Sequence, residues 1–225
     1  MRHTTGHPAS ETLPSPRLYA MESRKSISGV ADAQYRQINH LPLFMAALII
    51  RPSTDDDLPA ITAIYGHHVL HGTGTFETTP PSQTDMHSRR QDVLGKDLPY
   101  LVAERDGVTV GFAYANWFKP RPAYRFSTED SVYVAPEHMG KGVGVALMTA
   151  LLEALEAGGI RHVMAVIGDT QNHGSINLHR KMGFKEAGVM HGCGWKFNRW
   201  LDIVLMERKL GDGTNTPPVE SIDHT

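Results

Sequence analysis

The segment SVYVAPEHMGKGVG, residues 131–144, joins a short apolar run to a proline and then to three alternating glycines. An apolar helical segment, Val145 to Leu155, follows at once. A strand that leads through a glycine-rich loop into a helix N-terminus makes an anion site. Glycines let backbone N–H groups approach a ligand closely, and the helix dipole favours negative charge there. The segment therefore predicts a site for a phosphate-bearing cofactor.

Two common phosphate-binding loops do not fit these glycines. A Walker loop needs Ser or Thr after Gly-Lys to hold Mg²⁺, and here Gly142 follows Lys141. A dinucleotide fingerprint needs the spacing G-x-G-x-x-G, whereas residues 140–144 read G-x-G-x-G. The pattern that remains is the pyrophosphate loop Q/R-x-x-G-x-G/A of acetyl-CoA-dependent N-acetyltransferases, with Met139 at the usual Gln or Arg position. A glycine-rich turn that only caps a helix is the alternative.

Further motifs follow in a fixed order along the chain: TEDSVYV at residues 128–134, AVI at 165–167, Asn172, Ser175, the pair Leu178-His179, MGF at 182–184 and KFNRWLD at 196–202. With these motifs the sequence resembles the GNAT superfamily, in the branch of the phosphinothricin and methionine sulfone/sulfoximine acetyltransferases. The resemblance covers roughly Leu48 to Leu210. It implies acetyl-CoA as co-substrate, a small amino-acid-like amine as acceptor, and a homodimer.

Composition excludes several other classes. The chain has 225 residues, 40% of them hydrophobic, which is enough for one substantial core. A net charge of −2 gives no footprint for nucleic acid, and no apolar stretch approaches the length of a membrane span. The single Cys193 excludes an internal disulfide and suits a reducing cytoplasm. The 13 histidines are scattered without ligand spacing, so we expect no metal.

The ends of the chain differ from its middle. Residues 1–44 show little apolar periodicity, so they are either a disordered extension or the result of a start placed too far upstream, with Met45 the true start; we favour the second slightly. Residues 45–210 form the predicted acetyltransferase domain. The polar residues 211–225 are expected to be a flexible tail.

Within the domain, strands and helices are mixed, with an early hairpin and a later crossover. This arrangement predicts an α/β fold, which the resemblance specifies as the GNAT fold: a mixed, mostly antiparallel twisted sheet flanked by helices. The predicted strands are 48–51, 100–104, 108–117, 131–134, 163–167, 184–190 and 200–207. A first helix is expected to begin after a cap at Ser53 or Thr54, and three further helices are expected at 84–94, 145–156 and 175–182.

Acetyl transfer to an amine requires a base, and Glu129 is our candidate. In this branch the pattern T-x-E-x-[ST]-V-Y-V carries the proposed base, and Glu129 matches its Glu, although Thr128 directly precedes it and the spacing before the Glu departs from the pattern. A carboxylate in a closed site can take the proton directly or through water. A solvated loop acid is the alternative, and Asp130 is the competing carboxylate.

His179 is the second catalytic candidate. It lies four residues after Ser175 and seven after Asn172, so the three share one helical face. By resemblance the histidine supports catalysis; a packed helix histidine is the alternative. Many GNAT enzymes use a Tyr near the thiolate, but Phe184 occupies that position here, so a tyrosine acid is not available from it.

The remaining predicted contacts divide between the two substrates. Acetyl-CoA is expected to contact the backbone of Val132, Tyr133 and Val134, the loop residues Met139, Gly140, Lys141, Gly142, Val143 and Gly144, and the pair Asn172 and Ser175. For the acceptor carboxylate we expect Arg125, next to Tyr124, with Phe76 as a wall of the pocket, whereas Lys119 and Arg121 are interpreted as surface cations. The motif at 196–202 is interpreted as the turn into the last strand, with a place in the acceptor site or in a subunit contact as alternatives.

These residues predict an N-acetyltransferase that acts on the α-amine of a small amino acid such as phosphinothricin, methionine sulfoximine or methionine sulfone. Another amine, such as an aminoglycoside, a polyamine or a protein N-terminus, is the first alternative. A CoA-binding sensor without catalysis is the alternative of a different class.

Overall fold

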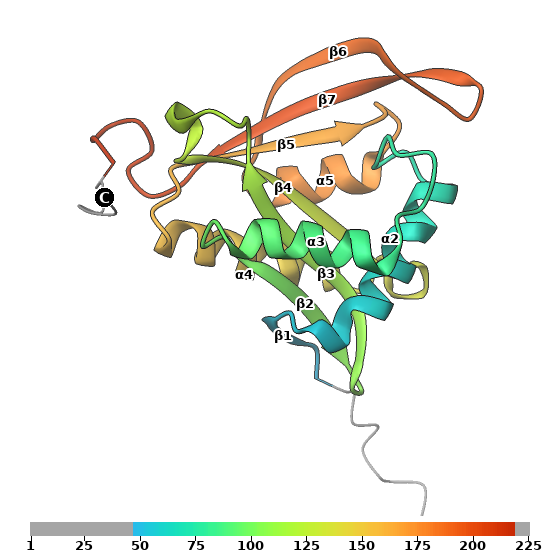
Figure 1. Ribbon diagram of the computed structural model, residues 1–225. Helices are drawn as coiled ribbons and strands as arrows, with labels where there is room; N and C mark the ends of the chain where they lie inside the picture. The colour runs from blue at the N-terminus through green and yellow to red at the C-terminus, as the bar shows by residue number, and fades with distance from the viewer. Residues whose placement is uncertain (1–46, 219–225) are drawn as a thin grey trace, which may run out of the picture. The chain divides into compact units, whose positions relative to one another are not determined.

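The computed structural model describes residues 47–218, so the expected extension at residues 1–44 lies outside the described residues. These residues form one seven-stranded sheet in the order β1-β2-β3-β4-β5-β7-β6 (Figure 1). All neighbours pair antiparallel except β4 and β5, which pair parallel. The strands are β1 Ile49–Pro52, β2 Tyr100–Arg105, β3 Val108–Trp117, β4 Ser127–Val134, β5 His162–Gly168, β6 Lys185–Lys196 and β7 Arg199–Lys209.

Helices cover both faces of the sheet: α2 Leu58–His71, α3 Gln83–Leu94, α4 Val143–Ala157 and α5 His173–Lys181. On one face, Phe112 stacks between Tyr100 and Tyr133, and the ring of Tyr65 from α2 lies 5.0 Å from that of Tyr133. On the other face, Gly111 faces α4, whose Leu147 and Leu151 are fully buried. Alternation along β3 thus assigns α2 and α4 to opposite faces. Within residues 47–218, no helix has the length and apolarity to cross a membrane.

The predicted mixed α/β sheet is confirmed, and the two largest differences at strand ends are in β4 and β6. β4 begins at Ser127 instead of Ser131, so Glu129 and Asp130 are strand residues that pair with Asn116 and Ala115 of β3. The sequence did not indicate this longer strand because its first residues are polar. Burial nevertheless alternates along it with a period of two, and Thr128 and Asp130 are the buried residues. β6 continues past Met190 to Lys196 because it pairs with β7 up to the turn.

The parallel contact between β4 and β5 is short. Only Ser127, Thr128 and Glu129 pair with β5, opposite His162, Val163 and Met164. Beyond Glu129 the two strands diverge, and residues of both line the same cavity. This divergence leaves one edge of β4 without a strand neighbour beside the glycine loop.

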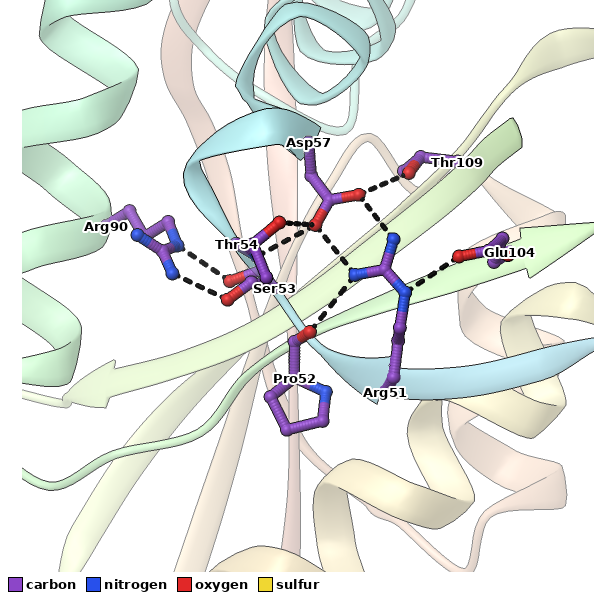
Figure 2. A network of polar contacts seen from close by, with 8 residues as sticks. All are labelled: Arg51, Pro52, Ser53, Thr54, Asp57, Arg90, Glu104 and Thr109. Carbon is purple, nitrogen blue, oxygen red and sulfur yellow. Dashed lines mark hydrogen bonds and ion pairs between the residues drawn. The ribbon is translucent and has the colours of Figure 1, made fainter. Parts of the chain in front are cut away.

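A polar network joins the first strand to the helices over the sheet (Figure 2). Arg51 donates to both carboxylate oxygens of Asp57 at 2.8 Å and to Glu104 at 2.7 Å. Arg90 of α3 donates to the hydroxyl and the carbonyl oxygen of Ser53 at 2.7 and 2.6 Å. Burial alone would raise the pKa of Asp57, but the hydrogen bonds from Arg51 and Thr109 hold it well below its ordinary value. The network therefore fixes the entry of α2 and the position of α3.

The other end of the domain closes with a turn. Of the expected tail, residues 211–218 are described, and Gly213 and Asn215 make backbone hydrogen bonds to Leu210 and Asp212. Asp212 also lies 3.8 Å from the guanidinium of Arg161. Residues 219–225 lie outside the described part.

Candidate active site

A cavity of about 1270 Å³ opens where β4 and β5 diverge. Its walls come from the last turns of α2, the loop of residues 72–76, both diverging strands, the glycine loop and α5. The cavity therefore places the anion-binding loop and the open edge of β4 in one space.

The glycine loop ends at Gly142, which is the N-cap of α4 and has a φ of +83°. Gly140 has a φ of +71°, and a Cβ at either glycine would meet nothing within 4 Å, so backbone conformation rather than space requires glycine here. The first N–H groups of an α-helix have no intrahelical acceptors, no side chain caps those of α4, and Gly142, Gly144 and Val145 line the cavity. This arrangement fits a pyrophosphate group.

The predicted loop residues do not all face the cavity. Met139, Gly140, Gly142 and Gly144 line it, as do Val132, Tyr133 and Val134 of β4. Lys141 is exposed and is absent from the lining, and Val143 is 1% exposed and belongs to the core. The side chains of these last two residues therefore form no part of the cavity wall.

His68 lies against the open edge of β4. Its Nε2 is 2.9 Å from the carbonyl oxygen of Val134, and its ring centroid is 5.4 Å from that of Tyr133. Burial lowers the pKa of His68, which favours a neutral ring that donates through Nε2. Sequence reasoning missed this residue because its partner is a backbone atom 66 residues away.

A buried ion pair lies at the far end of the same edge. His179 Nε2 is 3.0 Å from Oδ2 of Asp130, and the two side chains are 3% and 1% exposed. His179 Nδ1 lies 2.8 Å from the carbonyl oxygen of Ser175, which can only accept. Burial would lower the pKa of His179, but the hydrogen bond that it donates to Asp130, the charge of Asp130 and the hydrogen bond to the carbonyl oxygen of Ser175 together raise it. The geometry therefore favours an imidazolium beside a carboxylate.

The predicted face of α5 is present, and its members bond to one another. Asn172 is the N-cap and accepts from the backbone N–H of Ser175 at 3.3 Å. The hydroxyl of Ser175 lies 3.3 Å from Nδ1 of His179. All three residues line the cavity, so α5 forms one of its walls.

Glu129 is half-buried and lies between two cavities. It lines the main cavity and also a smaller one of about 440 Å³, with Lys96, Tyr114, Asn116, Trp117, Pro120 and Ser131. Within residues 47–218 no group hydrogen-bonds to its carboxylate. Burial and then the charge of Asp130 raise the pKa of Glu129, and Lys119 opposes them. A carboxylate with a raised pKa and free oxygen atoms can accept a proton from a bound ammonium.

The three residues expected at the acceptor pocket are not brought together. Phe76 lines the main cavity, whereas Tyr124 and Arg125 line neither cavity. Tyr124 is 39% exposed, and its ring lies 5.8 Å from that of Phe118. Arg125 is exposed, donates to the carbonyl oxygen of Pro122 at 3.0 Å and stacks over the ring of Phe126. In the described part of the chain, no three His, Cys, Asp or Glu side chains are grouped to hold a metal ion.

Comparisons with known proteins identify the family. Residues 67–184 match the family model described as "Acetyltransferase (GNAT) family". A phosphinothricin N-acetyltransferase from Alcaligenes faecalis is 48% identical over 198 residues, which cover 88% of this chain and 100% of that protein. An L-methionine sulfoximine/L-methionine sulfone acetyltransferase from Pseudomonas aeruginosa is 38% identical, covering 75% of this chain and 98% of that protein.

A solved structure gives the same result. The crystal structure of a phosphinothricin acetyltransferase from Sinorhizobium meliloti in complex with AcCoA superposes with a TM-score of 0.75 at 44% identity, over 77% of this chain and 94% of that one. The family and the fold expected from the sequence motifs are therefore confirmed: the chain belongs to the GNAT family of acetyltransferases.

Proposed function

We propose that this protein is an acetyl-CoA-dependent N-acetyltransferase that acts on the amine of a small amino acid of the phosphinothricin or methionine sulfoximine type. The observation that carries the proposal is the position of Glu129. Glu129 lines both the cavity that contains the glycine loop and a smaller cavity. A base that lines both cavities can accept a proton from an acceptor amine in one of them while the acyl donor is bound in the other.

The open edge of β4 and the uncapped end of α4 support binding of acetyl-CoA. The first N–H groups of α4 would hold the pyrophosphate, with Gly140 and Gly142 shaping the loop. The main-chain groups of Val132 to Val134 would run along the pantetheine arm, and Asn172 and Ser175 would border it from α5. This assignment places the thioester near Glu129.

In the proposed mechanism Glu129 accepts a proton from the acceptor ammonium, since free α-amines have a pKa near 8 and are charged at neutral pH. The free amine then attacks the thioester carbonyl carbon, and a new C–N bond forms. Main-chain N–H groups on the β4 edge stabilise the negative oxygen. The C–S bond breaks, the nitrogen gives up its second proton, the leaving coenzyme A thiolate takes up a proton through water to become the free thiol, and Glu129 releases its own proton to solvent. His179 supports this step through Asp130, which adjoins Glu129 in β4.

The acceptor amine would enter through the smaller cavity. Phe76 forms part of the wall on the side of the main cavity, and Arg125, with Tyr124, is proposed to hold the acceptor carboxylate as the sequence predicts. Because Arg125 lines neither cavity, this part of the proposal depends on an acceptor that extends from the cavity towards the segment before β4.

A homodimer in the cytoplasm completes the proposal. β6 is the last strand of the sheet, and its residues 185–193 are all exposed. Trp195, Phe197 and Trp200 at the turn to β7 are 49–65% exposed, an apolar surface that a second copy could cover. Cys193 is exposed and free, which suits a reducing compartment.

Release of free coenzyme A thiol with a panel of amines tests this function. We expect turnover with phosphinothricin, methionine sulfoximine and methionine sulfone, and little with their decarboxylated analogues. Preference for an aminoglycoside, a polyamine or a peptide N-terminus would replace the acceptor assignment. Binding of acetyl-CoA without thiol release on any amine would identify a sensor instead. Light scattering of the same sample gives the oligomeric state.

A further inference from the structure

A buried lysine lies outside the proposed catalytic machinery. Lys196, the last residue of β6, is 4% exposed. Its Nζ donates to the carbonyl oxygens of Gly72 and Thr75, both at 2.8 Å, and lies 5.0 Å from the ring centroid of Phe197. No carboxylate accepts from it among the described residues. An ammonium held only by main-chain carbonyls and a ring face points to a role in fixing backbone.

The backbone that Lys196 fixes is the loop after α2. Gly72 is the C-cap of α2, so its carbonyl belongs to the helix end, and Thr75 directly precedes Phe76. The two hydrogen bonds therefore bracket the loop that carries Phe76. The other side of the loop is held by Tyr65, whose hydroxyl lies 3.0 Å from Oγ1 of Thr75.

Two strand glycines leave the space that the Phe76 ring occupies. A Cβ at Gly194 of β6 would lie 2.2 Å from the Phe76 ring, and one at Gly168 of β5 would lie 2.7 Å from it. Real Cβ atoms do not approach other atoms so closely, so Phe76 rests directly on the main chain of both strands. Lys196 and Gly194 are two residues apart on the same strand, and together they determine where the ring lies.

A lysine suits this task because the carbonyls of Gly72 and Thr75 point to one place. Buried carbonyls left without a donor cost free energy, and one ammonium satisfies both. Burial lowers the pKa of Lys196, and the charge of Glu77 opposes this effect. Glu77 itself accepts hydrogen bonds from Arg89 at 2.6 Å and Tyr65 at 2.9 Å, so the carbonyl oxygens of Gly72 and Thr75 are the direct partners of the ammonium.

We propose that Lys196 is a positioning residue which, through the loop of residues 72–76, sets the place of Phe76 at the cavity wall and thereby the choice of acceptor amine. The inference rests on the proposed function, since Phe76 can select acceptors only if the cavity admits them. Lys196 itself does not line either cavity. Its effect on acceptors must therefore pass through Phe76.

The test replaces Lys196 by Met, which keeps the apolar stem and removes the donor. Lys185→Met, at an exposed position of the same strand, is the matched control. We expect Lys196→Met to change the ratio of kcat/KM between a small and a bulky amino-acid acceptor by about tenfold, the scale of a reshaped apolar pocket. Its Kd for acetyl-CoA should stay close to that of the wild type, and Lys185→Met should change neither quantity.

A double variant separates positioning from general damage. Phe76→Ala removes the ring that Lys196 is proposed to place, so adding Lys196→Met to it should leave the acceptor ratio unchanged. Gly194→Ala, which retains Lys196 and pushes on Phe76, should shift the ratio like Lys196→Met, and it replaces that variant if the latter does not fold. Equal loss of kcat/KM for all acceptors, or full additivity with Phe76→Ala, would overturn the proposal.

Hydrogen exchange distinguishes failure of this inference from failure of the proposed function. Backbone amides of residues 72–77 should exchange faster in Lys196→Met than in the wild type or in Lys185→Met, whether or not an amine is acetylated. Faster exchange in a protein that releases no thiol would leave the positioning role standing and reject the transferase. Unchanged exchange at these residues would reject the positioning role itself.

Discussion

Nε2 of His179 lies 3.0 Å from Oδ2 of Asp130, and this contact joins α5 to β4 inside the protein. The other ring nitrogen faces the carbonyl oxygen of Ser175. Two acceptors on one imidazole require two N–H groups, so the ring carries a positive charge while the pair is intact. Asp130 is thus compensated, although it directly follows the proposed base Glu129 in the strand.

Asp130→Asn should destabilise the protein in a pH-dependent way. The folded-state pKa of His179 is raised, so its contribution to stability is fully present below the unfolded pKa of about 6.5 and is lost as pH rises through the folded pKa. The free energy of unfolding should therefore differ most between wild type and variant below about pH 6.5. Urea denaturation at several pH values measures this difference. Asp97→Asn, at an exposed position, should show none, and a difference independent of pH would contradict the imidazolium assignment.

Glu129→Gln should lower kcat by about 10²–10⁴-fold, because it keeps the shape of the side chain and removes the base. Activity should recover partly at high pH, where free amine is abundant, and acetyl-CoA affinity should change little. The raised pKa of Glu129 predicts that the acidic limb of the wild-type rate lies above the ordinary range of a glutamate. Steady-state kinetics across pH checks both statements. A variant that keeps its neutral rate, while Asp130→Asn loses it, would transfer the role to Asp130.

Gly142→Asp should weaken acetyl-CoA binding by more than tenfold, or about 1.4 kcal/mol, because it adds an anion beside the pyrophosphate site. The position has a φ of +83°, so part of any effect is backbone strain. Gly142→Ala measures the strain without the charge. Gly107→Asp, at a positive-φ hairpin glycine, is the control for added charge elsewhere. Calorimetry that finds wild-type affinity in folded Gly142→Asp would remove the loop from the site.

Arg125→Ala should raise the KM for amino-acid acceptors and leave acetyl-CoA binding nearly intact. Decarboxylated amines should lose their disadvantage in this variant, because the group that recognises the carboxylate is gone. Lys119→Ala is the informative comparison. Lys119 lowers the pKa of Glu129, so its loss should move the acidic limb of the pH–rate profile to higher pH. Selective KM loss in Lys119→Ala instead of Arg125→Ala would reassign the carboxylate contact.

Asp57→Asn should lower the free energy of unfolding by about 3 kcal/mol at neutral pH, because it removes the negative charge that compensates Arg51 and one of the two oxygen atoms that accept hydrogen bonds at this buried position. The pKa of Asp57 is depressed in the fold. Its contribution is therefore present above the unfolded value of about 3.9 and is lost as pH falls through the folded pKa. Thermal unfolding of the variant and the wild type should converge in strong acid. Asp56→Asn, one residue earlier and exposed, should behave like the wild type.

Local patterns were enough to predict most helices and strands, the glycine loop and the turn at Phe197 and Asn198, both of which have positive φ. They failed where tertiary contacts decide the structure. Asp130 and His179 are 49 residues apart, and each alone resembles an ordinary polar residue. Lys196 bonds to carbonyls more than 120 residues away, and a backbone acceptor leaves no mark in the sequence. The predicted start of β4 lies four residues after the observed one, because Glu and Asp rarely indicate a strand.

The short parallel contact between β4 and β5 has a thermodynamic consequence. Beyond Glu129, one edge of β4 has no paired strand. The amide groups of a bound pantetheine arm could form hydrogen bonds along that edge. A ligand that binds only the folded state stabilises it by mass action, by about 2.7 kcal/mol when its concentration is a hundred times its Kd. The resistance of this protein to heat and proteolysis should then follow the acetyl-CoA level of the cell. The lifetime of the protein would in this way report on the supply of its own co-substrate.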